Sequence, residues 1–219
     1  MTRNKIKAVV FDLDGTLIDS KLDILGAFHF AFGSLDVPPP PDEALIHTIG
    51  ARLEECFTPF LGNDETLLKE AARLFRVYYE SHYLDKTRPF DGIDGVLKTL
   101  AKKHQLGLAT MKKGLYARRI IEAFGWAGLF TAVTGAEEGL RAKPDPEMLL
   151  KTIERLELQK SDVLYVGDTP VDHDMASNAG VDFLFVSWGY GVLDGCAAEV
   201  PTAETPRAII DLTDNGRAR

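Results

Sequence analysis

Short apolar runs alternate with longer amphipathic segments over most of the chain, and this alternation predicts its fold. The run from Ile6 to Phe11 is continuously apolar and rich in β-branched residues, as in a strand covered on both faces. Four more strands are predicted at 106–110, 130–134, 163–166 and 183–186, preceded by helices at 93–103, 115–124, 146–157 and 171–179. Strands that alternate with helices of this length predict an α/β fold with a Rossmann-like parallel sheet.

Between the first strand and the others, the pattern is helical throughout. Apolar positions at helical spacing form two stripes, one from Leu22 to Phe32 and one from Leu67 to Tyr78. A further helix is predicted from Asp42 to about Phe57. We therefore predict an all-helical cap domain seated over the strand ends. The predicted boundaries are residues 1–18 and 86–219 for the α/β core and residues 19–85 for the cap.

The composition of this 219-residue chain indicates which classes of molecule it can bind. Hydrophobic residues make up 45% and charged residues 26%, as in ordinary soluble globular proteins. The net charge of −8 argues against a general nucleic-acid surface, which needs a basic patch. It permits phosphate substrates, because a few lysines and a metal ion reverse the sign of the charge within a cleft.

The same sequence indicates a cytoplasmic protein. The first residues lead directly into a strand without a long apolar segment, and no stretch approaches the roughly 20 apolar residues of a membrane span. Cys56 and Cys196 have no CxxC context, so we predict free thiols in a reducing compartment. We expect a monomer or homodimer with no nucleic-acid or membrane partner.

Two carboxylates stand where the first strand ends and a glycine turn begins. Asp12 and Asp14 are separated by one residue, and Gly15 follows directly. Open α/β folds bind ligands at the carboxyl edge of the sheet, so this pair suggests an aspartate nucleophile for a phosphoryl group, with a hard cation beside it. The alternative is that both residues only start a turn, as aspartate often does.

Further polar residues follow the other predicted strands. They are Thr110 with Lys112, Lys143 in the loop 140–146, and Asp168 with Asp172. Each has a plain alternative: a strand-end hydroxyl, a solvated loop cation, or acids favoured by a helix N-terminus. In a parallel sheet these ends converge on one edge. Together they offer the nucleophile, the cation ligands and the donors that phosphoryl transfer requires.

These groups resemble the four motifs of the haloacid dehalogenase-like hydrolases, in the expected order and over essentially the whole chain. The matching segments are Asp12-Leu13-Asp14-Gly15-Thr16, Thr110, Lys143-Pro144, and Gly167-Asp168-Thr169 with Asp172. The chain is most similar to the phosphoglycolate-phosphatase-like branch, which carries a helical cap. Segments Leu17-Ile18-Asp19-Ser20 and Pro89-Phe90-Asp91-Gly92 carry that similarity.

The resemblance implies a role for each motif residue. Asp12 would attack phosphorus and form an aspartyl-phosphate, and Asp14 would act first as general acid and then as general base. The implied catalytic residues are Asp12, Asp14, Thr110 and Lys143. The implied Mg²⁺ ligands are Asp12, Asp14 through its backbone carbonyl, Asp168, and Asp172 directly or through water. The implied substrate-binding residues are Gly15, Thr16, Arg52, Thr110, Lys112 and Lys143.

Two features bear on substrate recognition. The second motif of this branch usually reads Thr-Asn-Lys, but here Met111 stands in the middle and cannot form the hydrogen bonds of an amide. The segment 48–53 resembles the part of the cap that faces the substrate. Arg52 or His47 is therefore a candidate for recognising the leaving group, with a solvated helix face as the alternative for each.

We predict a Mg²⁺-dependent phosphatase for a small phosphorylated metabolite, with phosphoglycolate as one candidate. A β-phosphoglucomutase-like phosphotransferase, a pyrophosphatase and a nucleotidase are alternatives of the same fold. A receiver-type phosphoaspartate signalling module also pairs an acceptor aspartate with Mg²⁺, a hydroxyl and a lysine, but such modules are far shorter. An inactive binding protein is disfavoured, because all four motif positions keep their chemistry.

Overall fold

The computed structural model describes residues 6–137, 139–193 and 200–214. Its centre is a six-stranded parallel sheet in the order β5-β4-β1-β6-β7-β8. The strands are β1 (Ala8–Phe11), β4 (Gln105–Lys113), β5 (Phe130–Ala136), β6 (Val163–Gly167), β7 (Asp182–Val186) and β8 (Thr202–Ala203). The predicted Rossmann-like sheet is confirmed, and β1 lies within it between β4 and β6.

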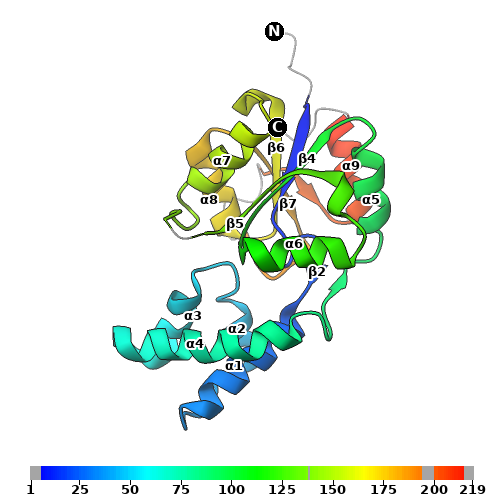
Figure 1. Cartoon of the computed structure of the whole chain (residues 1–219). Coiled ribbons are helices and arrows are strands. Elements are labelled where there is room, and N and C mark those ends of the chain that lie inside the picture. Colours follow the sequence, from blue (N-terminus) through cyan, green and yellow to red (C-terminus); the bar gives the residue numbers. More distant parts are fainter. Residues whose placement is uncertain (1–5, 138, 194–199, 215–219) are drawn as a thin grey trace.

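Helices cover both faces of this sheet (Figure 1). Side chains of β1 alternate between the faces: Val9 and Phe11 join one buried cluster, and Ala8 and Val10 join the other. The first cluster includes α5 (Ile93–Leu100), α6 (Gly114–Ala123) and α9 (Pro206–Asp214), and the second includes α7 (Glu147–Arg155) and α8 (Pro170–Ala179). Burial on both faces explains why the strands read as continuous apolar runs.

Four helices form a separate body below the sheet edge in Figure 1. They are α1 (Lys21–Ser34), α2 (Asp42–Ile46), α3 (Leu53–Leu61) and α4 (Glu65–His82). They enclose their own apolar cluster, in which Phe28, Phe57 and Phe75 contact one another edge to face. The helical cap is thus confirmed as an element of the fold, while the predicted domain boundaries stay a prediction.

One helix prediction in the cap is wrong. The continuous helix expected from Asp42 to about Phe57 is broken between Ile46 and Leu53. Gly50 lies in this break with φ of +106°, a conformation that ends a right-handed helix and that glycine adopts readily. The break brings residues 49–52 to the cavity between the cap and the core.

The chain passes between core and cap through two short strands that the sequence pattern did not indicate. β2 (Ile18–Asp19) pairs antiparallel with β3 (Arg88–Pro89). Beside them, the buried carboxylate of Asp23 accepts hydrogen bonds from the backbone N–H groups of Lys86 and Thr87, at 2.8–3.0 Å, and from the Thr87 hydroxyl. The outgoing and returning linkers are therefore tied to each other.

The remaining predicted helices and strands are present, with ends shifted by a few residues. β8 and α9 lie beyond the last predicted strand, and Ile209 of α9 is buried against α5. None of the described helices is both long and apolar enough to cross a membrane. Cys56 is a buried free thiol, and Cys196 lies outside the described residues.

Candidate active site

The polar residues expected at the strand ends meet at the carboxyl edge of the sheet. Asp12 directly follows β1, Thr110 lies near the end of β4, and Asp168 directly follows β6. Lys143 comes from the loop before α7, and its peptide bond to Pro144 is cis. Their convergence follows from the parallel order of the strands, which turns all these ends to one side.

A single ammonium joins two of the carboxylates. Nζ of Lys143 lies 2.8 Å from Oδ1 of Asp12 and 2.7 Å from Oδ1 of Asp172. The exposed fraction of these three side chains is 2%, 6% and 1%. The alternative of a solvated loop cation is therefore wrong for Lys143. We call the buried group of Asp12, Lys143, Asp168 and Asp172 the carboxylate floor.

Asp172 keeps the helix-terminal role that was its alternative and adds a second one. Its Oδ2 accepts hydrogen bonds from the backbone N–H and the hydroxyl of Thr169. The backbone N–H of Asp172 donates to that hydroxyl in return, which completes a capping box at the start of α8. Its Oδ1 faces Lys143 and lies 2.9 Å from the Tyr165 hydroxyl. The capping bonds orient the carboxylate, so that the other oxygen points into the floor.

Asp168 is held from two directions. Its Oδ1 accepts a hydrogen bond of 2.7 Å from the Thr16 hydroxyl, and its Oδ2 accepts one of 2.8 Å from the backbone N–H of Tyr190. Gly15 has φ of +85°, and a Cβ at that position would collide with the Asp168 carboxylate. Glycine is therefore required there both by the backbone conformation and by the close approach of Asp168.

Burial changes the proton affinities within the floor. Desolvation raises the pKa of Asp12 to about 6, although Lys143 opposes the rise. Desolvation and the charges of Asp172 and Asp12 raise the pKa of Asp168 well above its usual range. Burial also acts to raise the pKa of Asp172, but Lys143 and the hydrogen bonds to its carboxylate bring that pKa below its ordinary value.

These residues fit a hard divalent cation. Asp12, Asp168 and Asp172 each offer one carboxylate oxygen, and the three oxygens lie within 4.8 Å of one another. Oδ1 of Asp12 is buried beside Lys143 but accepts no hydrogen bond of normal geometry from the described residues. One ammonium does not balance three buried carboxylates, and oxygen ligands of this kind suit Mg²⁺.

The second carboxylate of the first motif, Asp14, has partners outside the carboxylate floor. Asp14 accepts a hydrogen bond from the Ser20 hydroxyl on Oδ1, and Nζ of Lys112 lies 3.0 Å from Oδ2. Lys112 is thus paired with Asp14. Thr110 is buried, and its hydroxyl accepts a hydrogen bond from the backbone N–H of Lys112.

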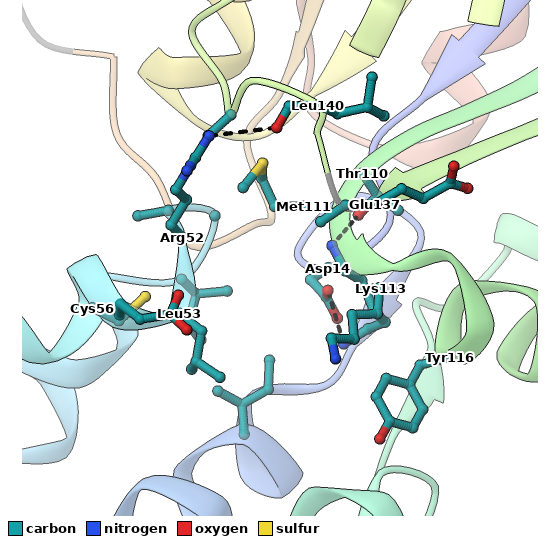
Figure 2. A pocket seen from close by; sticks show the side chains of 18 of the residues that line it. Asp14, Arg52, Leu53, Cys56, Thr110, Met111, Lys113, Tyr116, Glu137 and Leu140 are labelled. Carbon is teal, nitrogen blue, oxygen red and sulfur yellow. Dashed lines mark hydrogen bonds and ion pairs between the residues drawn. The ribbon is translucent and has the colours of Figure 1, made fainter. Parts of the chain in front are cut away.

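A cavity of about 760 Å³ separates the cap from the core at this edge of the sheet. Figure 2 shows Arg52, Leu53 and Cys56 of the cap on one side of it and Asp14, Thr110 and Met111 of the core on the other. The apolar part of the lining includes Ile24, Phe28, Phe75, Tyr79, Met111 and Tyr116. Met111 therefore presents a thioether to the cavity where the related motif has an amide.

Three charged residues of the cap line this cavity, and we call Arg52, Glu54 and Arg76 the cap wall. Nη2 of Arg76 donates to Oε1 of Glu54 at 2.6 Å, and Nη2 of Arg52 donates to the carbonyl of Leu140 at 3.4 Å. Arg52 therefore lies in the cavity lining, and its role toward the leaving group stays a prediction. His47, its alternative, is exposed and lies outside the lining.

Sequence reasoning missed the loop that follows β7. Tyr190 binds Asp168 through its backbone, and its hydroxyl accepts from the backbone N–H of Ser20 at 2.8 Å. A Cβ at Gly189 or Gly191 would collide with Asp168 or its backbone carbonyl. Two glycines flanking an aromatic residue just after a strand are a signal of close backbone approach that the sequence contained.

Comparison with known proteins agrees with this geometry. A sequence model described as haloacid dehalogenase-like hydrolase matches residues 9–186. A 5'-nucleotidase of Pseudomonas aeruginosa is 34% identical over 89% of this chain and 88% of its own length. A phosphoglycolate phosphatase of Aquifex aeolicus is 28% identical over 96% of this chain and 98% of its own length.

The fold is shared with solved structures. A haloacid dehalogenase-like hydrolase from Streptococcus pneumoniae superposes with a TM-score of 0.86 at 26% identity, covering 94% of this chain and 97% of that one. The resemblance seen in the motifs, the helical cap and the parallel sheet is therefore confirmed. The chain belongs to the haloacid dehalogenase-like hydrolases.

Proposed function

We propose that this protein is a Mg²⁺-dependent phosphatase that hydrolyses a small phosphomonoester through an aspartyl-phosphate intermediate. The observation that carries the proposal is the carboxylate floor. In it, Asp12 lies beside a lysine and two further carboxylates at the strand edge. Asp12 also lines the cavity, together with Asp14 and Thr110. Phosphoryl transfer needs a nucleophile, positive charge and an acid/base group in one place.

The first half-reaction transfers the phosphoryl group to the protein. A carboxylate oxygen of Asp12 attacks phosphorus while the bond from phosphorus to the leaving oxygen breaks, and a proton carried by Asp14 goes to that oxygen. Lys143 and the Thr110 hydroxyl hold the equatorial phosphoryl oxygens. Lys143 also favours the ionised form of Asp12, the form that can attack.

The second half-reaction releases phosphate. A water molecule attacks phosphorus, Asp14 accepts its proton, and the bond between phosphorus and the Asp12 oxygen breaks. Gly15 and Thr16 shape the turn that keeps the nucleophile and Asp168 adjacent. Two carboxylates one residue apart thereby take different roles, because Asp12 is paired within the floor and Asp14 is not.

Asp12, Asp168 and Asp172, with the backbone carbonyl of Asp14, are the groups that would hold Mg²⁺. When bound, Mg²⁺ supplies positive charge beside the transferring phosphoryl group and balances the excess charge of the floor. Lys143 and the capping bonds of Asp172 keep these carboxylates oriented.

We also propose residues 1–18 and 86–219 as the core domain and 19–85 as the cap domain, in line with the paired linkers.

Phosphoglycolate is one candidate substrate, supported by the relative from Aquifex aeolicus. A nucleoside monophosphate is the second candidate. The cavity of about 760 Å³ is large for a two-carbon leaving group and has aromatic walls, and the relative from Pseudomonas aeruginosa is a 5'-nucleotidase. Arg52 of the cap wall would face the leaving group in either case.

The experiment is hydrolysis of 4-nitrophenyl phosphate with Mg²⁺ and with EDTA, followed by a panel containing phosphoglycolate, nucleoside monophosphates, sugar phosphates and pyrophosphate. We expect turnover that requires Mg²⁺ and is abolished in Asp12→Asn. A folded Asp12→Asn variant with full turnover would rule out the aspartyl-phosphate route. Transfer of phosphate between sugar positions without release would favour a phosphotransferase.

A further inference from the structure

The Asp14 carboxylate is held on both oxygens, and the two contacts come from different parts of the chain. The Ser20 hydroxyl, at the entrance to the cap, donates to Oδ1. The Lys112 ammonium, near the end of β4, lies 3.0 Å from Oδ2. Asp14 lines the cavity, so these contacts determine how its carboxylate faces a bound molecule.

Lys112 has a second partner that belongs to the cap. Its Nζ donates to the Tyr79 hydroxyl of α4 at 2.6 Å and lies 4.8 Å from the centre of that ring. Both side chains are buried, with Lys112 5% exposed. Within the described residues, this ammonium has one ion-pair partner, Asp14, and one hydrogen-bond acceptor, Tyr79. Lys112 therefore bridges a core carboxylate and a cap hydroxyl.

The bridge determines the position of the Lys112 ammonium. Because the four-carbon side chain is flexible, a buried ammonium is held in place by the acceptors around it. With the Tyr79 hydroxyl present, Nζ is fixed between two oxygens. If the cap moves away or the hydroxyl is removed, one acceptor is lost, and the position of Nζ against Asp14 is no longer determined.

Ser20 uses its hydroxyl for Asp14 and not for capping helix α1. Serine at a helix N-cap ordinarily accepts a hydrogen bond from the first turn, but Ser20 makes no side-chain cap to α1. Its hydroxyl points to Asp14 instead, and its backbone N–H donates to the Tyr190 hydroxyl. Each contact of Asp14 is thus supported by a tyrosine: Ser20 is bound by Tyr190 of the core, and Lys112 by Tyr79 of the cap.

We propose that Tyr79 is a positioning residue that acts through Lys112 to orient Asp14 for proton transfer, so that a hydroxyl of the cap completes the acid/base group of the core. The inference rests on the proposed function, in which the proton of Asp14 passes to the leaving oxygen as its bond to phosphorus breaks. Tyr79 itself takes no part in that transfer.

The test compares two esters of similar size in Tyr79→Phe, with Mg²⁺ present. Benzyl phosphate has a poor leaving group that needs protonation, whereas the nitrophenolate of 4-nitrophenyl phosphate leaves with little help. We expect kcat/KM of the variant to fall about tenfold for benzyl phosphate and less than about twofold for 4-nitrophenyl phosphate. The ratio of the two values does not depend on the fraction of enzyme that is folded.

Two variants make the test specific. Tyr83→Phe removes a hydroxyl from the same aromatic cluster, outside the cavity lining, and is expected to leave the ratio unchanged. Lys112→Met removes the bridge and is expected to show the same leaving-group selectivity as Tyr79→Phe. Adding Tyr79→Phe to Lys112→Met should then change the ratio no further, because Tyr79 acts through Lys112.

An equal loss of kcat/KM on both esters, no loss on either, or a further change in the double variant would each overturn the inference. These outcomes leave the proposed function intact if Asp14→Asn still shows leaving-group selectivity. If the wild-type protein hydrolyses neither ester with Mg²⁺, or if Asp12→Asn keeps its turnover, the proposed function fails and the inference fails with it.

Discussion

The carboxylate floor reaches the cavity through Asp12 and the cap wall lines the same cavity, yet the two groups hold their charges in opposite ways. In the floor, Lys143 lies between Asp12 and Asp172, and all three side chains are almost fully buried. In the cap wall, the side chains of Arg52, Glu54 and Arg76 are 47%, 40% and 36% exposed. Their ion pairs are partly solvated.

In the proposed function, this difference separates the chemical step from selection of the substrate. A buried charge is costly unless its partners stay in place, so removing one member of the floor leaves the others uncompensated. A half-exposed ion pair contributes little to stability, so cap-wall residues can be exchanged with small effects on folding. The floor is suited to a reaction common to many substrates, and the cap wall to distinguishing among them.

Lys143→Met should have the largest effect. It leaves Asp12 and Asp172 buried without their ammonium, and we expect the free energy of unfolding in EDTA to fall by about 3–5 kcal/mol. Urea denaturation followed by circular dichroism measures the change. A loss below about 1 kcal/mol would mean that the buried ion pairs of the floor contribute no more to stability than an exposed ion pair.

Gly15→Ala tests whether the backbone beside the floor is as sensitive to substitution as the buried charges are. The left-handed φ and the collision with Asp168 should cost about 3 kcal/mol of unfolding free energy. Gly33→Ala in α1 is the matched control, because a Cβ there meets no atom within 4 Å. We expect the control to differ from wild type by less than about 1 kcal/mol in thermal or urea denaturation.

Mg²⁺ should stabilise the protein through the floor alone. At a concentration about 100 times its Kd, the ion should add about 2.7 kcal/mol to the free energy of unfolding. Asp168→Asn should lose most of this increment. In EDTA, Asp168→Asn should lose less stability than Lys143→Met, because burial disfavours the charge that the amide removes. An equal increment in both proteins would contradict the metal assignment.

Arg76→Met should have the smallest effect on folding. The loss of its partly exposed pair with Glu54 should change the free energy of unfolding by less than about 1 kcal/mol. We expect KM of the best substrate in the panel to change severalfold while kcat changes less than twofold. A fall in kcat with KM unchanged would mean that the cap wall takes part in the chemical step.

Much of the floor was predictable, because its geometry follows from topology. Once the strands are parallel, Asp12, Thr110 and Asp168 must emerge on one edge, and a helix that begins at Pro170 brings Asp172 to the same place. The cap was less predictable. The break between Ile46 and Leu53 lies within a pattern that reads as one helix, and only the path of the chain over the cavity shows why it is there.

The amino-acid sequence alone determined the α/β class, the helical insertion and the motif positions, because these depend on local periodicity and on strand order. The tertiary structure decided which partner each charge has. Asp172 caps its helix and pairs with Lys143, and Lys112 reaches both Asp14 and Tyr79. The Lys112–Tyr79 contact depends on how the cap sits against the core, and the others on how segments of the core pack together. No pattern of neighbouring residues reports the distance between segments so far apart in the chain.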